Sequence, residues 1–360
     1  MQFSAQVTSV TRTYIVPDLF SQINVGSPLL LSVLSEAAEW STGTKYELIV
    51  KTALSTNGGV TGIADQLDSS RQTNRATMSF EPRSNYKPVV VANIEMELNK
   101  GDERILDLVH SEMMSQAADL CESQADLVFA GTGVGNDWSS IAMAADDGTN
   151  YSTYGGLSRT TYSALAGYYL ASVGSLTLAK LATAFDAVEA GTDSPTGIFT
   201  TKSLWSVYET LLTPIVNANY TAVGSQMASM TPDGIVMGKE ALSGSQGFRA
   251  VTYRGTPIMK DEHCPSGRVF LVNSKKNGKF RNFGFAAINR SGKEFSTVNF
   301  SKKDGSPVGT FGSSKVPRGF NFRDMMSPVD QLAQVGYLLF DGEFIAAEPR
   351  LQGILLGVTA

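Results

Sequence analysis

The sequence predicts an α+β fold, with helices and β-strands in largely separate stretches of the chain. Two observations predict this class: apolar and polar residues alternate between residues 45 and 97, and apolar residues at helical spacing follow over residues 102–129. A third observation is the β-rich pattern of residues 255–360, with short apolar runs of strand length. A length of 360 residues is sufficient for two or three compact domains or one larger irregular one.

The N-terminal stretch, residues 1–41, predicts an extended arm followed by a short helix. Residues 1–28 are polar and mixed, with Pro17 and Pro28 as helix breakers. Apolar residues then recur at helical spacing, which predicts a short amphipathic helix over residues 29–40. The first ten residues carry neither the basic nor the apolar region of a signal peptide, so we expect no signal peptide.

Residues 42–98 predict a long β-ribbon. Apolar residues at 46, 48 and 50 alternate with a mixed set, residues 77–80 alternate likewise, and residues 89–97 are a further strand candidate. The intervening residues 52–75 are rich in Gly, Ser, Thr, Asn and Gln, with a polar tip at Asn57, Gly58 and Gly59. Such a ribbon has too few apolar residues for a core of its own, so we expect it to pack on a partner.

Residues 99–130 predict one long helix with an apolar stripe and an acidic outer face. Asp102 is the expected cap and Gly131 the expected stop, which gives a rod on the order of 40 Å long. The apolar stripe comprises Ile105, Leu106, Val109, Met113, Ala117, Leu120 and Leu127. One base, Arg104, stands against seven acids: Asp102, Glu103, Asp107, Glu112, Asp119, Glu122 and Asp126.

The rest of the chain predicts an α/β stretch and then a β-rich return. After the loop-rich residues 131–156, we expect a helix capped by Ser175 or Thr177 and closed by Gly191. A strand at residues 197–201 precedes a second helix, capped by Ser203 and ended by Pro214. Further strands are predicted at residues 234–237, 248–253, 256–259, 268–273, 333–340, 344–347 and 354–358.

The charge is distributed unevenly along the chain. The formal net charge is −5, yet residues 254–323 hold 14 Lys/Arg against 4 Asp/Glu, and the remainder holds 15 against 30. Basic residues lie between aromatic ones in this region, so nucleic-acid binding is one interpretation; the residues are Lys275, Lys276, Lys279, Arg281, Lys302 and Lys303 with Phe280, Phe283 and Phe285. We favour an electrostatic contact with acidic faces of neighbouring copies, because no nucleic-acid motif is visible and the whole chain is acidic.

Positive evidence for an enzyme is absent from the sequence. The two histidines, His110 and His263, and the two cysteines, Cys121 and Cys264, have no metal or disulfide spacing, and the adjacent His263–Cys264 pair favours a turn over a nucleophile. Residues 131–135 are glycine-rich but follow a helix, which is the wrong order for a dinucleotide site. Asp146 and Asp147 favour a solvated loop pair over a cation site, and dispersed paired carboxylates stay open. We expect no cofactor, no metal and no membrane span.

The order of parts resembles the major capsid protein of tailed bacteriophages, which has the Hong Kong 97-type (HK97-like) fold. Three stretches carry the resemblance: residues 154–162 (YGGLSRTTY), residues 255–261 (GTPIMKD) leading to 269–273 (VFLVN), and residues 334–337 (QVGY) through 348–353 (EPRLQG). It implies an N-terminal arm (1–41), a β-hairpin E-loop (42–98), a long spine helix of the P-domain (99–130), mostly A-domain (131–254), and a β-rich return (255–360) that combines P-domain strands, the basic region and the end of the A-domain.

The resemblance implies that copies assemble as hexamers and pentamers into an icosahedral shell around double-stranded DNA. The arm and E-loop would then lie on neighbouring subunits. The candidate contacts between subunits are Asn57, Gly58, Gly59, Arg71, Arg75, Lys275, Lys276, Lys302 and Lys303. The candidate interior acidic face, which would repel DNA, comprises Asp107, Glu112, Asp119, Glu122 and Asp126.

The partners that the resemblance implies are a portal and packaged DNA, without sequence-specific binding, in a virion assembled in the bacterial cytoplasm. Only about 40 residues precede the ribbon, so we expect a separate scaffolding protein, unless a longer precursor has already been trimmed, and a decoration protein is left open. Residues 52–86 contain no lysine, which argues against the covalent cross-links of some members. The alternatives are a bacterial nanocompartment (encapsulin-like) shell protein and, from another class, a soluble α/β hydrolytic enzyme.

Overall fold

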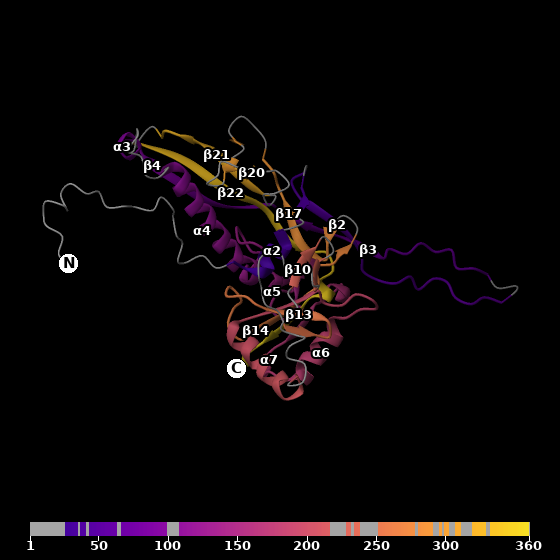
Figure 1. Ribbon diagram of the computed structural model, residues 1–360. Helices are drawn as coiled ribbons and strands as arrows, with labels where there is room; N and C mark the ends of the chain where they lie inside the picture. Colours follow the sequence, from indigo (N-terminus) through magenta and orange to yellow (C-terminus); the bar gives the residue numbers. More distant parts are fainter. Residues whose placement is uncertain are drawn as a thin grey trace.

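The computed structural model describes residues 26–34, 37–40, 43–62, 66–98, 108–216, 228–231, 234–237, 251–277, 280–290, 295–296, 299–301, 307–310, 319–328 and 332–359. It has an upper sheet lined by one long helix, a lower sheet flanked by two helices, and a hairpin that projects far to one side (Figure 1). The predicted α+β class is confirmed.

The upper sheet is organised around one strand, β22 (Ala333–Ala346). On one side β22 pairs antiparallel with β4 (Arg83–Ala92), and on the other side with β21 (Phe320–Met326) and then β17 (Phe283–Ala287). The outer positions are occupied by β1 (Ala38–Glu39), parallel to β17, and β18 (Phe295–Ser296), beside β21.

The prediction of two separate strands at 333–340 and 344–347 was wrong, because β22 runs through Asp341 and Gly342 without a turn. Gly342 has φ 150°, and a Cβ there would lie 2.2 Å from the carbonyl oxygen of Ala286. A glycine is therefore needed at this position because two strands approach closely there. In the sequence, such a glycine cannot be told apart from one that marks a turn.

The long helix α4 (Leu108–Ala130) packs against β4 and β22, with Leu120, Val128 and Phe129 fully buried. Its predicted end at Gly131 is confirmed: the Gly131 N–H donates to the Leu127 carbonyl at 2.9 Å. The predicted cap, Asp102, lies outside the described residues. At 1.5 Å per residue the described helix is about 35 Å long.

Two predicted elements in the N-terminal third have different bounds. The helix predicted at 29–40 is α2 (Pro28–Leu34), almost wholly buried, and the chain continues into the strand β1. The strand predicted at 89–97 ends at Ala92 and is followed by α3 (Asn93–Leu98). The reason is local capping, since the Glu95 carboxylate accepts a hydrogen bond from the Ala92 N–H at 3.3 Å.

The lower sheet has the order β12 (Val251–Tyr253), β13 (Thr256–Lys260), β9 (Gly197–Thr200), β14 (Arg268–Val272), β23 (Gly353–Leu356) and β7 (Tyr168–Leu170). Its second core forms with α6 (Leu178–Val188) and α7 (Lys202–Val216). Thr177 caps α6, as one of the two predictions states. The bounds predicted for α7 were wrong: it begins before Ser203 and continues beyond Pro214, because a proline removes one hydrogen bond without necessarily ending a helix.

A large aromatic cluster joins the upper sheet to the loop after α4. The Trp138 ring lies 5.7 Å from Phe340 and 5.8 Å from Phe285, and the latter two rings stack at 4.6 Å.

Short elements complete the described chain: α5 (Ile141–Ala144), β5 (Thr153–Tyr154), β6 (Leu157–Ser158), η1 (Ser163–Leu165), β8 (Gly174–Ser175), β10 (Ala228–Thr231), β11 (Gly234–Met237), β15 (Lys276–Asn277), β16 (Phe280–Arg281), β19 (Asn299–Ser301), β20 (Pro307–Thr310), η3 (Pro349–Leu351) and β24 (Val358–Thr359).

The motif at residues 154–162 has a structural role in the main core. Tyr154 is buried, and its hydroxyl accepts a hydrogen bond from the Ala346 N–H at 2.7 Å. The buried Arg159 guanidinium donates to the carbonyls of Met143, Tyr151 and Leu165 at 2.8–3.1 Å. The Arg159 side chain therefore ties together α5, the loop at Tyr151 and the short helix η1.

Candidate assembly surfaces

The projecting hairpin is anchored firmly at its base. Strands β2 (Tyr46–Lys51) and β3 (Arg75–Phe80) pair antiparallel over six residues, with one half-buried and one exposed face, as the alternation predicts. The Tyr46 ring packs on Trp40 at 5.4 Å and on Phe280 at 5.7 Å. The base of the hairpin thus belongs to the main core.

Beyond the ends of β2 and β3, hydrogen bonds of side chains connect the two limbs in place of backbone–backbone hydrogen bonds. Regular pairing ends where the Thr52 N–H donates to the Asn74 carbonyl at 2.9 Å. Further out, the Gln72 side chain accepts a hydrogen bond from the Thr56 N–H at 2.9 Å, and the Asn57 amide donates to the Ser70 carbonyl at 2.6 Å. These contacts hold two extended limbs together far from the body of the protein (Figure 1).

The hairpin extension exposes apolar side chains that the sequence-based prediction missed. Leu54, Val60 and Leu67 are exposed on the two limbs, and Ile49 is exposed on β2. Isolated apolar residues in an otherwise polar stretch were the signal that could have indicated them. These four side chains share one projecting element, and exposed apolar surface that is contiguous is typical of interaction sites.

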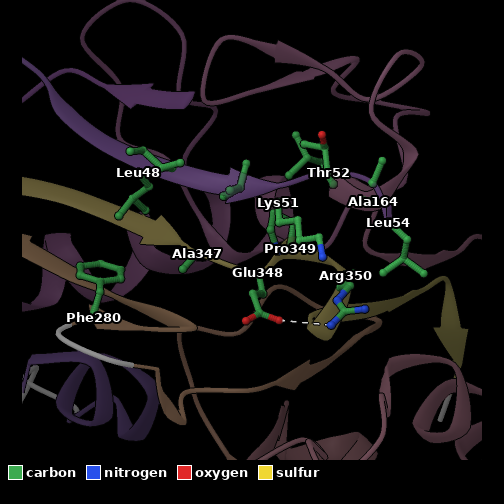
Figure 2. Close-up of a pocket in the computed structure, with 14 residues that line it drawn as sticks. Leu48, Lys51, Thr52, Leu54, Ala164, Phe280, Ala347, Glu348, Pro349 and Arg350 are labelled. Carbon is green, nitrogen blue, oxygen red and sulfur yellow. Dashed lines mark ion pairs between the residues drawn. The ribbon is translucent and has the colours of Figure 1, made fainter. Parts of the chain in front are cut away.

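A groove of about 660 Å³ runs along the hairpin base. Figure 2 shows Leu48, Lys51 and Thr52 on its β2 side and Ala347, Glu348 and Arg350 on the opposite side. Glu348 and Arg350 form an ion pair at 3.5 Å, and Phe280 and Leu165 contribute apolar surface. The outer edge of β2 faces no partner strand in the described part of the chain.

The predicted contact residues of the hairpin lie on its surface. Gly58, Gly59, Arg71 and Arg75 are exposed, and Asn57 is partly buried by its own hydrogen bonds. In the basic region, Lys275 pairs with Asp193 within the chain at 2.6 Å, and Lys276 is exposed. Lys302 and Lys303 lie outside the described residues.

The five acids predicted to form one face of the long helix have different environments. Asp119 is exposed, whereas Glu112 is half-buried and accepts a hydrogen bond from Gln116 at 2.9 Å. Glu122 and Asp126 both contact His263, so the helix does not present them as free charges. Asp107 lies outside the described residues.

The three aromatic residues on which the nucleic-acid interpretation rests are unavailable for stacking on bases. Phe280, Phe283 and Phe285 are buried in the main core. Arg281 is buried as well, and its guanidinium donates to the Ser274 carbonyl at 2.9 Å. Binding of single strands requires exposed aromatic faces, so this part of the nucleic-acid interpretation loses its basis.

The glycine-rich loop after α4 has no free cradle of amides. The Gly133 N–H donates to the Trp138 carbonyl at 2.9 Å, and the Thr132 N–H donates to Asp137 at 2.7 Å. The carbonyls of Gly133 and Gly135 accept from Arg83 at 2.9 and 3.2 Å. A phosphate site needs amides that point outward, and here these two are already bonded.

The prediction of a solvated Asp146–Asp147 pair was wrong for Asp146, because backbone N–H groups hold its carboxylate inside the protein. Asp146 is buried and accepts hydrogen bonds from the N–H groups of Gly148 and Tyr151, both at 2.9 Å, while Asp147 is exposed. Burial raises the pKa of the Cys264 thiol, which opposes a nucleophilic role. Within the described ranges no group of three His, Cys, Asp or Glu side chains is arranged so that it could hold a metal ion, and no helix is both long and apolar enough to span a bilayer.

No protein-family model matches the chain, and no curated protein matches its sequence. Solved structures match it over nearly its whole length. The capsid asymmetric unit of cyanophage A-1(L) aligns with a TM-score of 0.68 at 13% identity, covering 99% of this chain and 100% of that one. The capsid of a native GTA particle aligns with a TM-score of 0.55 at 10% identity, covering 99% of this chain and 98% of that one.

A third structure, the holo-SrpI encapsulin complex of Synechococcus elongatus PCC 7942, aligns with a TM-score of 0.53 at 11% identity, covering 99% of this chain and 96% of that one. All three are shell assemblies by name. The chain therefore has the fold of shell-forming proteins. That fold is the HK97-like fold that the sequence resemblance predicts.

Proposed function

We propose that this chain is the major capsid protein of a tailed bacteriophage, whose copies assemble as hexamers and pentamers into an icosahedral shell around double-stranded DNA. The observation that carries the proposal is the projecting hairpin, with Leu54, Val60 and Leu67 exposed on limbs that extend away from the body. In a monomer these side chains would stay in water. In a ring of copies the hairpin reaches the next subunit, since head-to-tail contacts close into rings.

The groove at the hairpin base supports the same proposal. It lies between β2 and residues 347–350, and among the described strands β2 pairs with β3 alone. An open strand edge is a liability that proteins cover in their working state. Contact with a neighbouring subunit would cover this edge and the exposed Ile49 together.

The proposal includes the division of the chain into arm, E-loop, spine helix, A-domain and β-rich return. It also includes a portal, a separate scaffolding protein, packaged DNA and a virion location, with assembly in the host cytoplasm. It assigns no catalytic role. Asp119 and Glu112 are the described α4 acids that remain for repelling DNA, because Glu122 and Asp126 contact His263.

The second candidate function is a nanocompartment shell protein, because an encapsulin has the same fold over 99% of this chain. The two functions differ in what the shell contains. A capsid protein requires a portal and encloses DNA, whereas a nanocompartment encloses a cargo protein. Terminase and portal genes beside this gene would support the first function, and a cargo-enzyme gene would support the second.

Size-exclusion chromatography and electron microscopy of the purified chain test the proposal. We expect megadalton particles, or hexameric and pentameric capsomers where a scaffolding protein is needed. A monomer or dimer at all concentrations would contradict it and favour the soluble-enzyme alternative. Nuclease-protected DNA in particles from infected cells would separate the phage function from the nanocompartment function.

A further inference from the structure

The His263 side chain joins the long helix to the lower half of the protein. His263 lies in the turn between β13 and β14 of the lower sheet. Its Nε2 atom lies 2.9 Å from Glu122 Oε2, and its Nδ1 atom lies 2.8 Å from Asp126 Oδ1. The two acids are one helical turn apart on α4, so their carboxylates reach both sides of one ring.

The chemistry of this contact depends on a proton. Ionised carboxylates only accept hydrogen bonds, and a neutral imidazole has a single N–H to donate. Two carboxylate oxygens within hydrogen-bond distance of both ring nitrogens are therefore satisfied only by the imidazolium form. In the neutral form, one nitrogen lone pair would face a carboxylate oxygen, and that contact becomes repulsive.

The two carboxylates differ in burial, so they differ in how strongly each stabilises the charged His263 ring. The His263 side chain is 10% exposed, Glu122 is 23% exposed and Asp126 is 70% exposed. Solvent screens the Asp126 contact strongly and the Glu122 contact less. The Nε2–Glu122 contact is thus the main ionic contact, and Asp126 orients the ring from the other side.

The other charged groups around the ring also favour its charged form. The backbone N–H of His263 donates to Asp261 Oδ1 at 3.0 Å, and Asp261 also accepts from Ser27 at 2.6 Å. Glu262, the residue before the histidine, pairs with Lys202 of α7. Arg268 of β14 acts electrostatically on the adjacent Cys264. The two charged side chains described in contact with the ring, Glu122 and Asp126, are both acids.

We propose that His263 is a clamp that holds α4 against the lower sheet when the imidazole ring is protonated. The protonated ring binds both carboxylates and stabilises the joint. As pH rises and the ring loses its proton, one carboxylate contact is lost and the joint loosens. The clamp is a property of the single chain, so it does not depend on the proposed function. In a shell, the clamp would make the angle between α4 and the lower sheet depend on pH.

Hydrogen–deuterium exchange of the full chain tests the clamp in two segments, residues 119–130 and 258–266. Variants are compared with wild type at equal pH, so that intrinsic exchange rates cancel. At pH ~6 we expect His263→Gln to exchange about fivefold faster than wild type in both segments, and at pH ~9 we expect a difference below about twofold. A difference of the same size at both pH values, or none at pH ~6, would overturn the proposal.

Three further variants make the test specific. His263→Arg keeps two donors and a permanent charge, so its protection should not change between the two pH values. Glu122→Gln can accept from the charged ring through its carbonyl oxygen and donate to the neutral ring through its amide, so its protection should depend on pH less than that of wild type. His110→Gln removes the other histidine of the chain and should follow wild type at both pH values. Loss of the pH dependence in His110→Gln would also contradict the clamp.

Discussion

Arg83 at the start of β4 forms an ion pair with the fully buried carboxylate of Glu343 near the end of β22. The same guanidinium donates to the carbonyls of Gly133 and Gly135, and the Ser139 N–H donates to Glu343 at 2.7 Å. Burial raises the pKa of Glu343, and the Arg83 charge acts in the opposite direction. The pair therefore fixes the loop after α4 to the centre of the upper sheet.

We expect Arg83→Met to destabilise the protein by about 3–5 kcal/mol at pH ~8, because it leaves a buried carboxylate without its cation. Without Arg83 the pKa of Glu343 rises further, so the folded state holds a proton that the unfolded state releases. Stability of the variant then falls as pH rises, and its deficit should be smaller at pH ~5. Denaturant unfolding at the two pH values measures this, with Arg83→Lys as the charge-preserving control. An equal deficit at both pH values would count against the pair.

Gly342 in the middle of β22 should not tolerate a side chain. A Cβ there would lie 2.2 Å from the Ala286 carbonyl oxygen and 2.5 Å from the Phe285 ring. We expect Gly342→Ala to cost on the order of 1–3 kcal/mol, seen as a lower thermal midpoint. Gly59→Ala is the matched control, since nothing lies within 4 Å of its added Cβ. Equal midpoints for the two variants would show that the strand separation adapts.

Local patterns predicted the elements that local physics decides. The alternation of Tyr46, Leu48 and Val50 predicted β2, and Gly131 marked the end of α4, because periodicity and caps act within a few residues. The same local signals failed at Gly342, where a strand 56 residues away in sequence requires the glycine; Ala286 is the residue it approaches. Turns and closely approaching strands both favour glycine, so the sequence alone does not distinguish them.

The candidate surfaces divide in the same way. A polar ribbon without a core of its own was predictable from composition, and its tip at Asn57 lies on the projecting hairpin. The environment of Glu122 was not predictable, because its partner His263 is 141 positions further along the chain. The burial of Phe280 could not be predicted either. Basic residues near aromatic ones indicate an exposed surface, and only the tertiary contacts show that this ring is buried.

We expect the assembled shell to lack covalent links between subunits. Residues 52–86, which form most of the projecting hairpin, contain no lysine to attack a neighbour's side chain. After boiling in detergent, particles should therefore run as a single band at the subunit mass of 38.5 kDa. The measurement is a denaturing gel of purified particles. A ladder of multimers that resists reducing agent would refute this prediction.

The acidic surface of α4 should matter for DNA rather than for folding. Asp119 is exposed and Glu112 half-buried, so replacing both with lysine should change thermal stability by less than about 1 kcal/mol. Each replacement adds two positive charges relative to wild type, which attracts phosphate. In an infectious system we expect slower packaging or ejection, with Asp119→Asn and Glu112→Gln as milder controls. Packaging and ejection at wild-type rates in the lysine variant would rule out this role.

The exposed apolar residues of the hairpin provide the sharpest test of self-assembly. Leu54, Val60 and Leu67 contribute nothing to the core of their own chain, so replacing all three with serine should leave the unfolding midpoint of unassembled subunits unchanged. Assembly should fall by about tenfold or more, because the serine variant buries less apolar surface when subunits associate. Sedimentation of assembled and free protein measures the fraction assembled. Val134→Ser removes an equally exposed apolar residue away from the hairpin and should assemble normally. If the triple variant assembles as wild type does, the hairpin does not provide the contact between subunits.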